Sequence, residues 1–385
     1  MRCKESADRQ RASKPVTTDD SPPVRRSIEV EYWVIDDEGR LTDADGLAAA
    51  APGVEREFVE PLIEIKTTPC VSTAELRAEL FERLRAVLQQ AAALDKRLVP
   101  LATPLNHDEI RELPSERTRI QNDVIGEAFQ YVRHCAGTHI HFEQQPGHTV
   151  DQLNTLIALD PALALLNSTP YFRGEAIAAG ARSKLYRWRA YDGLDHQGRL
   201  WPYPTDTVEW NRRLEARYAE FRQQALDAGV DRAAVESCFD PESAVWTPVQ
   251  LRAEFNTVEW RSPDATLPAR IIRLADTMAE IIDRLRDCEV KIGGDTPRIV
   301  DDEIVLPEFE TVRNHVAAAI EDGLSATALR SYLTRMGFDV DAYEPVTHDL
   351  AGRAPVTPTE ARQLRLQYAD RLRAEVTQTP AAEAD

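Results

Sequence analysis

Side chains that can bind metals or anions alternate with apolar residues at four places in the chain. The segments read E-x-E at 29–31, L-x-E at 62–64, H-x-H at 139–141 and E-x-R at 259–261. Because alternate residues of a β-strand point to the same face, each segment predicts a strand with one apolar face and one functional face. Carboxylates that converge with one or two histidines favour Mg²⁺ or Mn²⁺ over Zn²⁺, and an added arginine suits a phosphate or a carboxylate.

The density of these pairs distinguishes the four segments from ordinary half-solvated strands. For a single strand, a polar face turned toward water is the usual interpretation. Three dense pairs in a chain with only 8 His favour a site that lines a concave sheet. The chain contains no G-x-x-x-x-G-K-[ST] and no G-x-S-x-G motif. A bound nucleotide would therefore depend on carboxylate-held metal and scattered arginines, and no side-chain nucleophile is indicated.

The elements that must position these residues follow from the hydrophobic periodicity. Strands are expected at 27–35, 62–67, 138–142 and 257–261, and helices at 72–94, 150–167, 210–228 and 268–290, with two more within 308–335. Ser72 and Glu75 form a capping-box pattern at the start of the first helix. The segment 170–205 is rich in aromatic residues, Arg and Gly, and is expected to be a long ordered loop.

The order of these elements lacks the regular βαβ alternation of a parallel sheet. We therefore expect an α+β fold in which helices cover one face of an antiparallel sheet. No Pro- or Ser-rich linker divides the middle of the chain, so a single catalytic domain is expected at 25–375, with helical additions at its C-terminal end. Residues 1–24 are expected to form a disordered polar tail, and residues 376–385 a frayed end.

The composition excludes some classes of partner. The 385-residue chain has a formal net charge of −19, with 6 Lys and 40 Arg, and so acidic a surface repels nucleic acid and anionic membranes. Abundant carboxylates with scarce lysine favour a halophilic source. No stretch approaches the roughly 18 apolar residues of a membrane span, and no apolar leader is present, so a cytoplasmic protein is expected. The five cysteines include no C-x-x-C, which argues against a disulfide framework or a zinc ribbon.

Five segments resemble, in order and at matching spacing, motifs of glutamate–cysteine ligase family 2. They are Ser27–Glu31, Leu62–Ile65, Gly137–Phe142, Leu166–Arg189 and Thr257–Asp264. The fourth segment contains L-N-S-T-P-Y-F-R-G and G-A-R-S-K, which is similar to the carboxylate–amine ligase subgroup. Together with the acidic composition, this resemblance points to the haloarchaeal type.

The resemblance implies a glutamine-synthetase-like fold, in which a curved antiparallel sheet carries helices on its convex face and substrates on its concave face. It also implies a reaction that depends on ATP and on Mg²⁺ or Mn²⁺. ATP would phosphorylate the γ-carboxylate of glutamate, and the amine of L-cysteine would attack the acyl phosphate to give γ-glutamylcysteine. The implied partners are these small molecules, with no nucleic acid and no membrane, and the oligomeric state is left open.

The resemblance further implies metal-binding and catalytic residues. The implied metal ligands are Glu29, Glu31, Glu64, His139 and Glu259. Glu57 and Glu60 precede the second strand and are weaker candidates. Glu259 and Arg261 are the implied catalytic residues, because Arg261 matches a position that faces phosphate or the substrate carboxylate.

Four more residues are implied as substrate or nucleotide ligands. His141 occupies a position where relatives have Asn or His, so a polar contact is expected there. The family's S-x-R segment has Lys184 at the place of its arginine in one alignment, and Lys is a poorer bidentate ligand. Arg182 or Arg187 could take that role instead, so all three basic residues are candidates.

Three other functions remain open from the sequence. The first is a carboxylate–amine ligase with an amine other than cysteine, since no residue identifies a thiol pocket. The second is a metal-dependent hydrolase with zinc at H-x-H, which would need further His and Asp ligands. The remaining six histidines lack ligand spacing. The third is a scaffold without activity, which the retained Glu29, Glu31, Glu64, Glu259 and Arg261 argue against.

The acidic composition predicts a stability that depends on salt. As KCl is removed and the Debye length grows from about 3 Å to about 10 Å, repulsion among surface carboxylates should lower the melting temperature. Thermal melts over a series of KCl concentrations measure this effect. A melting temperature that does not change with KCl would contradict the halophilic interpretation.

Overall fold

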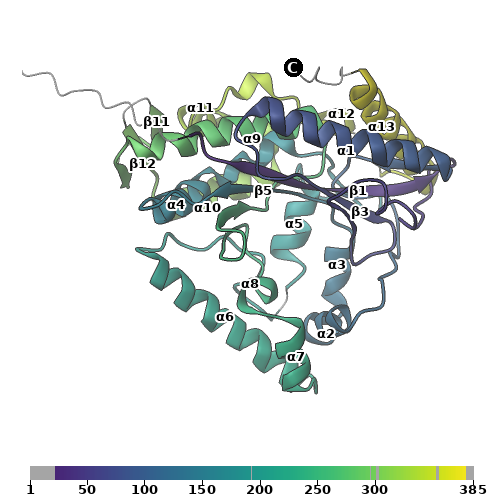
Figure 1. Ribbon diagram of the computed structural model, residues 1–385, viewed down its shortest axis with the longest axis horizontal. Coiled ribbons are helices and arrows are strands. Elements are labelled where there is room, and N and C mark those ends of the chain that lie inside the picture. The colour runs from purple at the N-terminus through teal and green to yellow at the C-terminus, as the bar shows by residue number, and fades with distance from the viewer. Residues whose placement is uncertain (1–21, 192, 295, 301–302, 353–354, 379–385) are drawn as a thin grey trace, which may run out of the picture.

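An antiparallel sheet of seven strands forms the centre of the computed structural model, which describes residues 22–191, 193–294, 296–300, 303–352 and 355–378 (Figure 1). The strands are β1 (Arg26–Asp36), β2 (Val54–Arg56), β3 (Leu62–Lys66), β4 (Lys96–Val99), β5 (Thr138–Glu143), β8 (Val249–Arg252) and β9 (Thr257–Trp260). Six of them follow the order β2-β3-β1-β5-β9-β8, and β4 pairs with β1. All of these pairings are antiparallel.

The strand register brings the polar pairs of the sequence into direct contact. Glu29 lies opposite Lys66 on β3 and opposite His139 on β5. In the same way Glu31 lies opposite Glu64. One step along the sheet, His141 of β5 lies opposite Glu259 of β9. The intervening residues of β1, among them Ile28, Val30 and Val34, are fully buried in the core, so the alternation in sequence becomes two chemically different faces.

Three long helices cover the apolar face of the sheet. They are α1 (Thr73–Ala93), α9 (Pro268–Asp283) and α13 (Pro358–Gln378), and Figure 1 shows them on the same side of the sheet. The expected capping box starts α1, where Glu75 N–H donates to the Ser72 hydroxyl and the Glu75 carboxylate accepts from the backbone of Ser72. The predicted α+β fold, an antiparallel sheet with helices on the face away from the polar pairs, is confirmed.

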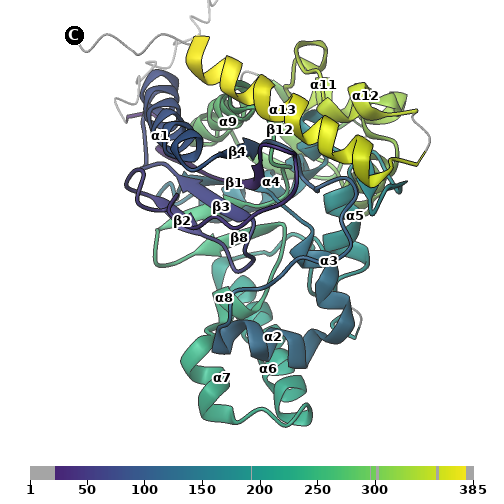
Figure 2. The ribbon, with the colours of Figure 1, turned by 90° about the vertical axis from the view of Figure 1, so that its right-hand side faces the viewer.

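A second helical group, which the sequence did not predict as a unit, lies across from the polar face (Figures 1 and 2). It contains α2 (Glu116–Ile125), α3 (Gln130–Arg133), α5 (Ala181–Trp188), α6 (Thr207–Asp227), α7 (Arg232–Cys238) and α8 (Pro241–Ala244). Arg117 joins α2 to the distant α7–α8 segment by donating to the carbonyls of Cys238 and Ser243, each at 2.7 Å. The group therefore faces the sheet as one layer.

The other elements lie around these layers. They are α4 (Thr149–Leu159), α10 (Phe309–Glu321), α11 (Thr327–Arg335), α12 (Val346–Leu350), the 3₁₀ helices η1 (Gly126–Phe129), η2 (Asp160–Leu166), η3 (Arg284–Arg286), η4 (Gly323–Ser325) and η5 (Val340–Ala342), the β6 (Tyr171–Phe172) and β7 (Glu175–Ala176) hairpin, and a small sheet of β10 (Val290–Ile292), β11 (Arg298–Val300) and β12 (Glu303–Leu306). Among the described helices, none combines the length and the apolar character that a membrane span requires.

Several expected boundaries differ from the structure. The segment 170–205 is not one loop, since it contains β6, β7 and α5. The helix expected at 150–167 becomes 3₁₀ at Asp160, where Pro161 follows. Val24 is buried and donates its N–H to Asp283 at 2.8 Å, so order begins before residue 25. At the other end α13 continues to Gln378 with Val376 buried. The rest of the two expected tails lies outside the described residues.

Candidate active site

A cavity of about 410 Å³ lies between the polar face of the sheet and the second helical group. Its sheet wall carries the residues that the sequence pairs predicted: Glu29, Glu31, Glu64, His139, His141, Glu259 and Arg261. The opposite wall comes from α2, α5, α8 and the loops beside them. Strand alternation and register thus gather in one cavity side chains that lie more than 200 residues apart in the chain.

The carboxylate side of this cavity has the geometry of a metal site. Three groups each bring their ligand atoms within 4.8 Å of one another: Glu29 with Glu64 and His139, Glu29 with His141 and Glu259, and Glu31 with Glu57 and Glu64. The groups overlap, because Glu29 and Glu64 each belong to two of them. Of the two weaker candidates, Glu57 therefore joins the cluster, whereas Glu60 does not line the cavity.

Burial and mutual repulsion oppose the ionisation of the carboxylates on this side. Burial raises the pKa of Glu31 to about 7, and the negative charge of Glu64 adds to the rise. Burial also raises the pKa of Glu57 to about 7, with a contribution from Glu31. The pKa of Glu64 is raised well above its ordinary value by burial and then by Glu57. These carboxyl groups are difficult to ionise at the same time. A divalent cation bound to their oxygens would favour the ionised forms.

Two buried polar atoms, one on a histidine and one on a carboxylate, form no hydrogen bond among the described residues and also suit a bound cation. The His141 Nδ1 lies 3.0 Å from the hydroxyl of Thr257, which fixes the ring. Its Nε2 is buried and forms no hydrogen bond among the described residues, and it lies 3.6 Å from Glu29 and 3.7 Å from Glu259. Glu259 Oε2 is also buried without a hydrogen bond there, and its ion pair with Arg252 is 3.5 Å long. His139 Nδ1 lies 3.2 Å from Glu259 and 3.4 Å from Glu29. A buried polar atom without a hydrogen bond is costly, and the three residues bring ligand atoms within 4.8 Å of one another, so a cation is a chemically suitable occupant of the Glu29–His141–Glu259 group.

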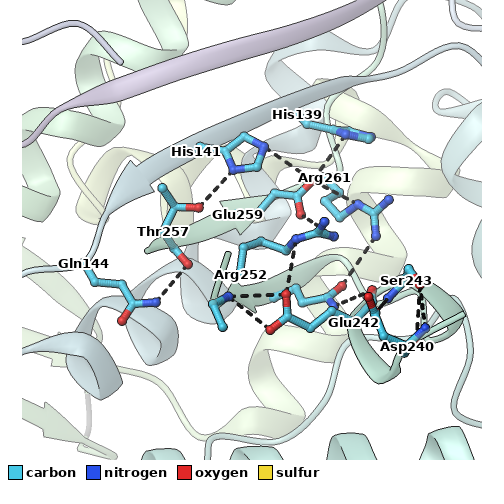
Figure 3. A network of polar contacts seen from close by, with 12 residues as sticks. His139, His141, Gln144, Asp240, Glu242, Ser243, Arg252, Thr257, Glu259 and Arg261 are labelled. Carbon is cyan, nitrogen blue, oxygen red and sulfur yellow. Dashed lines mark hydrogen bonds and ion pairs between the residues drawn. The ribbon is translucent and has the colours of Figure 1, made fainter. Parts of the chain in front are cut away.

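The other side of the cavity is cationic, and Glu259 connects the two sides (Figure 3). Arg261 Nε lies 3.2 Å from Glu259 Oε1, and its guanidinium lies over the ring of Trp246. Arg252 Nη1 lies 3.5 Å from Glu259 Oε2 and Nε lies 3.6 Å from Glu242. Burial would raise the pKa of Glu259, but Arg261, His141, His139 and Arg252 together outweigh burial and lower it. Glu259 is therefore held ionised between histidines and arginines.

Arg182 reaches the same cavity from α5. Its guanidinium donates to the carbonyls of Ser262 at 3.0 Å and Arg261 at 3.2 Å, and its buried Nε has no hydrogen-bond partner among the described residues. The guanidinium crosses Gly137 so closely that a Cβ at that position would overlap it. The absence of a side chain at Gly137, the glycine of the G-x-H motif, therefore leaves space for Arg182. The backbone N–H of Gly137 donates to Glu31 at 2.5 Å.

The other two basic candidates lie outside the cavity. Lys184 donates to Glu321 on α10 at 2.7 Å. Arg187 is buried and forms a bidentate pair with Asp160, at 2.7 and 3.1 Å. Both side chains are thus engaged elsewhere, and of the three only Arg182 lines the cavity. We therefore do not retain Lys184 and Arg187 as ligand residues.

The structure also adds residues that the sequence did not single out. Arg252, Glu242 and Trp246 line the cavity, as do Tyr186 and Tyr191 of the segment expected to be a loop. Only Arg252 carried a readable signal, because V-Q-L-R at 249–252 has a polar and apolar alternation. The others come from loops and short helices without a periodic pattern.

The raised pKa values of Glu31 and Glu57 predict how metal-free stability changes with pH. A carboxyl whose pKa rises from 4.5 to about 7 on folding binds more protons in the folded state, so unfolding becomes easier as pH rises between these values. With a chelator in the buffer, the melting temperature should fall by several degrees from about pH 5 to about pH 8. Addition of Mg²⁺ in excess of the chelator should raise the melting temperature again at the higher pH. If the Glu31→Gln/Glu57→Gln double variant keeps the full pH dependence, other groups cause it.

Gly137 gives a second prediction. Gly137→Ala should lower the free energy of unfolding by about 1–3 kcal/mol, because the new methyl group displaces Arg182. The same substitution should cost much less in an Arg182→Ala background, where the space is open. Urea denaturation of the two single variants and the double variant measures both costs, and equal costs in both backgrounds would contradict the packing argument.

Comparison with known proteins places the chain in a family. A protein of Chloroflexus aggregans named "Putative glutamate--cysteine ligase 2" is 25% identical over 269 residues, which are 66% of this chain and 63% of that protein. A Paenarthrobacter aurescens protein named "Putative glutamate--cysteine ligase 2-1" is 25% identical over 252 residues, 62% and 65% of the two chains. The match thus spans less than two thirds of the length of these relatives.

Two solved structures are similar in fold. The glutamate–cysteine ligase of Francisella tularensis, in complex with AMP, has a TM-score of 0.57 at 14% identity and covers 94% of this chain and 91% of its own. A bifunctional glutathione synthetase from Pasteurella multocida has a TM-score of 0.53 at 16% identity, covering 92% and 53%. A sequence model of glutamate–cysteine ligase family 2 matches residues 27–318, a range that contains all seven residues named above for the sheet wall of the cavity. This chain therefore belongs to glutamate–cysteine ligase family 2.

Proposed function

We propose that this chain is an ATP-dependent carboxylate–amine ligase that joins the γ-carboxylate of glutamate to the amino group of cysteine. The observation that carries the proposal is the cavity itself. Overlapping groups of carboxylates with metal-ligand spacing lie beside the buried Arg182 and the partly buried Arg261. This juxtaposition suits a polyanionic nucleotide that shares its site with a carboxylate substrate.

The chemistry explains why the site needs cations rather than a nucleophile. A carboxylate is a poor electrophile, and transfer of a phosphoryl group to one of its oxygens makes it reactive toward an amine. Bound Mg²⁺ or Mn²⁺ would neutralise the charge of the phosphates. The residues that would hold the metal are Glu29, Glu64, His139, Glu259 and the Glu31–Glu57 pair. Arg261 and Arg182 would bind phosphoryl or carboxylate oxygens, since guanidinium groups match both planar and tetrahedral oxyanions.

Two observations support cysteine as the amine substrate. The relatives carry glutamate–cysteine ligase names, and the acidic composition is typical of the haloarchaeal type that the motifs resemble. We propose a halophilic source on the same grounds. The cavity lining includes aromatic and cationic side chains such as Trp246 and Arg252, which would also accept other amino acids. A ligase with a different amine substrate is therefore the second form of the proposal.

A substrate screen tests the function directly. Phosphate release from ATP should require glutamate and Mg²⁺, and cysteine should stimulate it most among the standard amino acids in concentrated KCl. Stimulation by a different amine would keep the ligase and overturn cysteine. Tightly held zinc with turnover in the absence of ATP would replace the ligase with a hydrolase.

Glu29→Gln provides the matched test of the metal site. The variant loses one charge without a change of volume from a residue shared by two metal groups, so turnover should fall by at least about a hundredfold with the fold intact. Glu143→Gln is the control, because Glu143 lies on β5 outside the cavity and pairs with Arg25. Full activity of Glu29→Gln at saturating Mg²⁺ would contradict the assignment.

A further inference from the structure

A buried carboxylate that no motif marked lies behind the cavity wall. Asp160 is the first residue of η2 and is fully buried. Its side chain accepts hydrogen bonds from Arg187, at 2.7 and 3.1 Å, and from the indole of Trp260, at 2.9 Å. It also accepts a hydrogen bond from the hydroxyl of Ser262. One carboxylate thus ties together η2, α5 and the end of β9.

These contacts surround Ser262, which immediately follows Arg261. Arg182, in the first turn of α5, donates to the Ser262 carbonyl at 3.0 Å. Arg187, in the last turn of the same helix, donates to the Ser262 hydroxyl at 2.7 Å. Both ends of α5 therefore contact Ser262. Because Arg182 also donates to the Arg261 carbonyl at 3.2 Å, the backbone of one cavity cation anchors the side chain of the other.

We propose that Asp160 is a positioning residue, which sets the places of the Arg182 and Arg261 guanidinium groups through Arg187 and Ser262. Asp160 does not line the cavity, so it acts on substrates only through these neighbours. A movement of α5 or of the end of β9 would leave a buried charge short of donors, and such a state is strongly disfavoured. The inference rests on the proposed function for its kinetic consequences, whereas the positional consequences are independent of it.

Asp160→Asn is the direct test, because the amide keeps the shape but presents N–H groups toward the donors of Arg187. The affinity for Mg-ATP and the value of kcat/KM should fall by about tenfold to a hundredfold, as displaced guanidinium groups lose their oxyanion contacts. Binding of Mn²⁺ alone should stay unchanged, because its ligands lie on the carboxylate side. Equal loss of Mn²⁺ and Mg-ATP binding would indicate general damage to the fold and would overturn the proposal.

Asp276→Asn is the matched control. It breaks the Arg26–Asp276 pair between β1 and α9, in which Arg26 is buried and neither residue lines the cavity. The control should lower the melting temperature and leave Mg-ATP affinity unchanged. If it weakens Mg-ATP binding as much as Asp160→Asn does, the loss follows from stability alone.

A double-variant cycle with Arg182→Met tests the route of action. If Asp160 acts through Arg182, Asp160→Asn should weaken Mg-ATP binding much less in the Arg182→Met background than in the natural chain. Independent losses that multiply would overturn this route. Ser262→Ala, which removes only the shared hydroxyl, should produce a smaller loss in the same direction, and it serves as the test if Asp160→Asn does not fold.

Hydrogen exchange separates this proposal from the proposed function. In Asp160→Asn, amides of α5 and of residues 257–264 should exchange faster than in Asp276→Asn, whether or not the protein is a ligase. Absence of ligase activity in the natural chain would reject the proposed function but not the positioning role. Unchanged exchange in both segments would reject the positioning role, even in an active ligase.

Discussion

Mutual repulsion among the carboxylates of the cavity determines how the surrounding fold must hold this site. Glu29, Glu31, Glu57 and Glu64 approach one another in a single cavity, and burial together with mutual charge raises the pKa of three of them. Lys66, which contacts Glu64 at 2.9 Å, offsets only part of this charge. Such a cluster requires a scaffold that holds it rigidly, and bound cations would offset the remaining repulsion.

The fold supplies that rigidity from both sides. Antiparallel register fixes which side chains are neighbours, and the apolar face that α1, α9 and α13 cover keeps the strands from shifting, since a slip of one residue would exchange the two faces. Across the cavity, α2, α5 and α8 form the opposite wall. Glu259 then connects the carboxylates to Arg252 and Arg261, so metal and anion binding share one network.

The sequence predicted the functional residues that alternate along strands, and it did not predict those that only tertiary contacts bring together. Alternation alone placed Glu29 with Glu31 and His139 with His141 on one face. The fold class, an antiparallel sheet with helices on one face, was predicted correctly, but the strands β2, β4 and β8 and the covering helix α13 were not predicted. Nothing in a strand pattern gives the pairing of strands, so the contact of Glu57 with Glu31 was not accessible. The helix α5 was missed because two of its buried residues are Arg182 and Arg187, which break the apolar stripe that predicts a helix. Asp160 before Pro161 is typical of a helix start, which conceals its role as a buried acceptor.

We propose that the cavity activates a carboxylate by phosphorylation, and this step can be followed by the transfer of labelled oxygen from glutamate to phosphate. Glutamate whose γ-carboxylate carries heavy oxygen would be turned over with ATP and cysteine, and the released phosphate would be analysed by mass spectrometry. We expect one heavy oxygen in each phosphate, because the amine displaces phosphate together with the oxygen that came from the carboxylate. Phosphate that contains only the oxygens of ATP and water would contradict it.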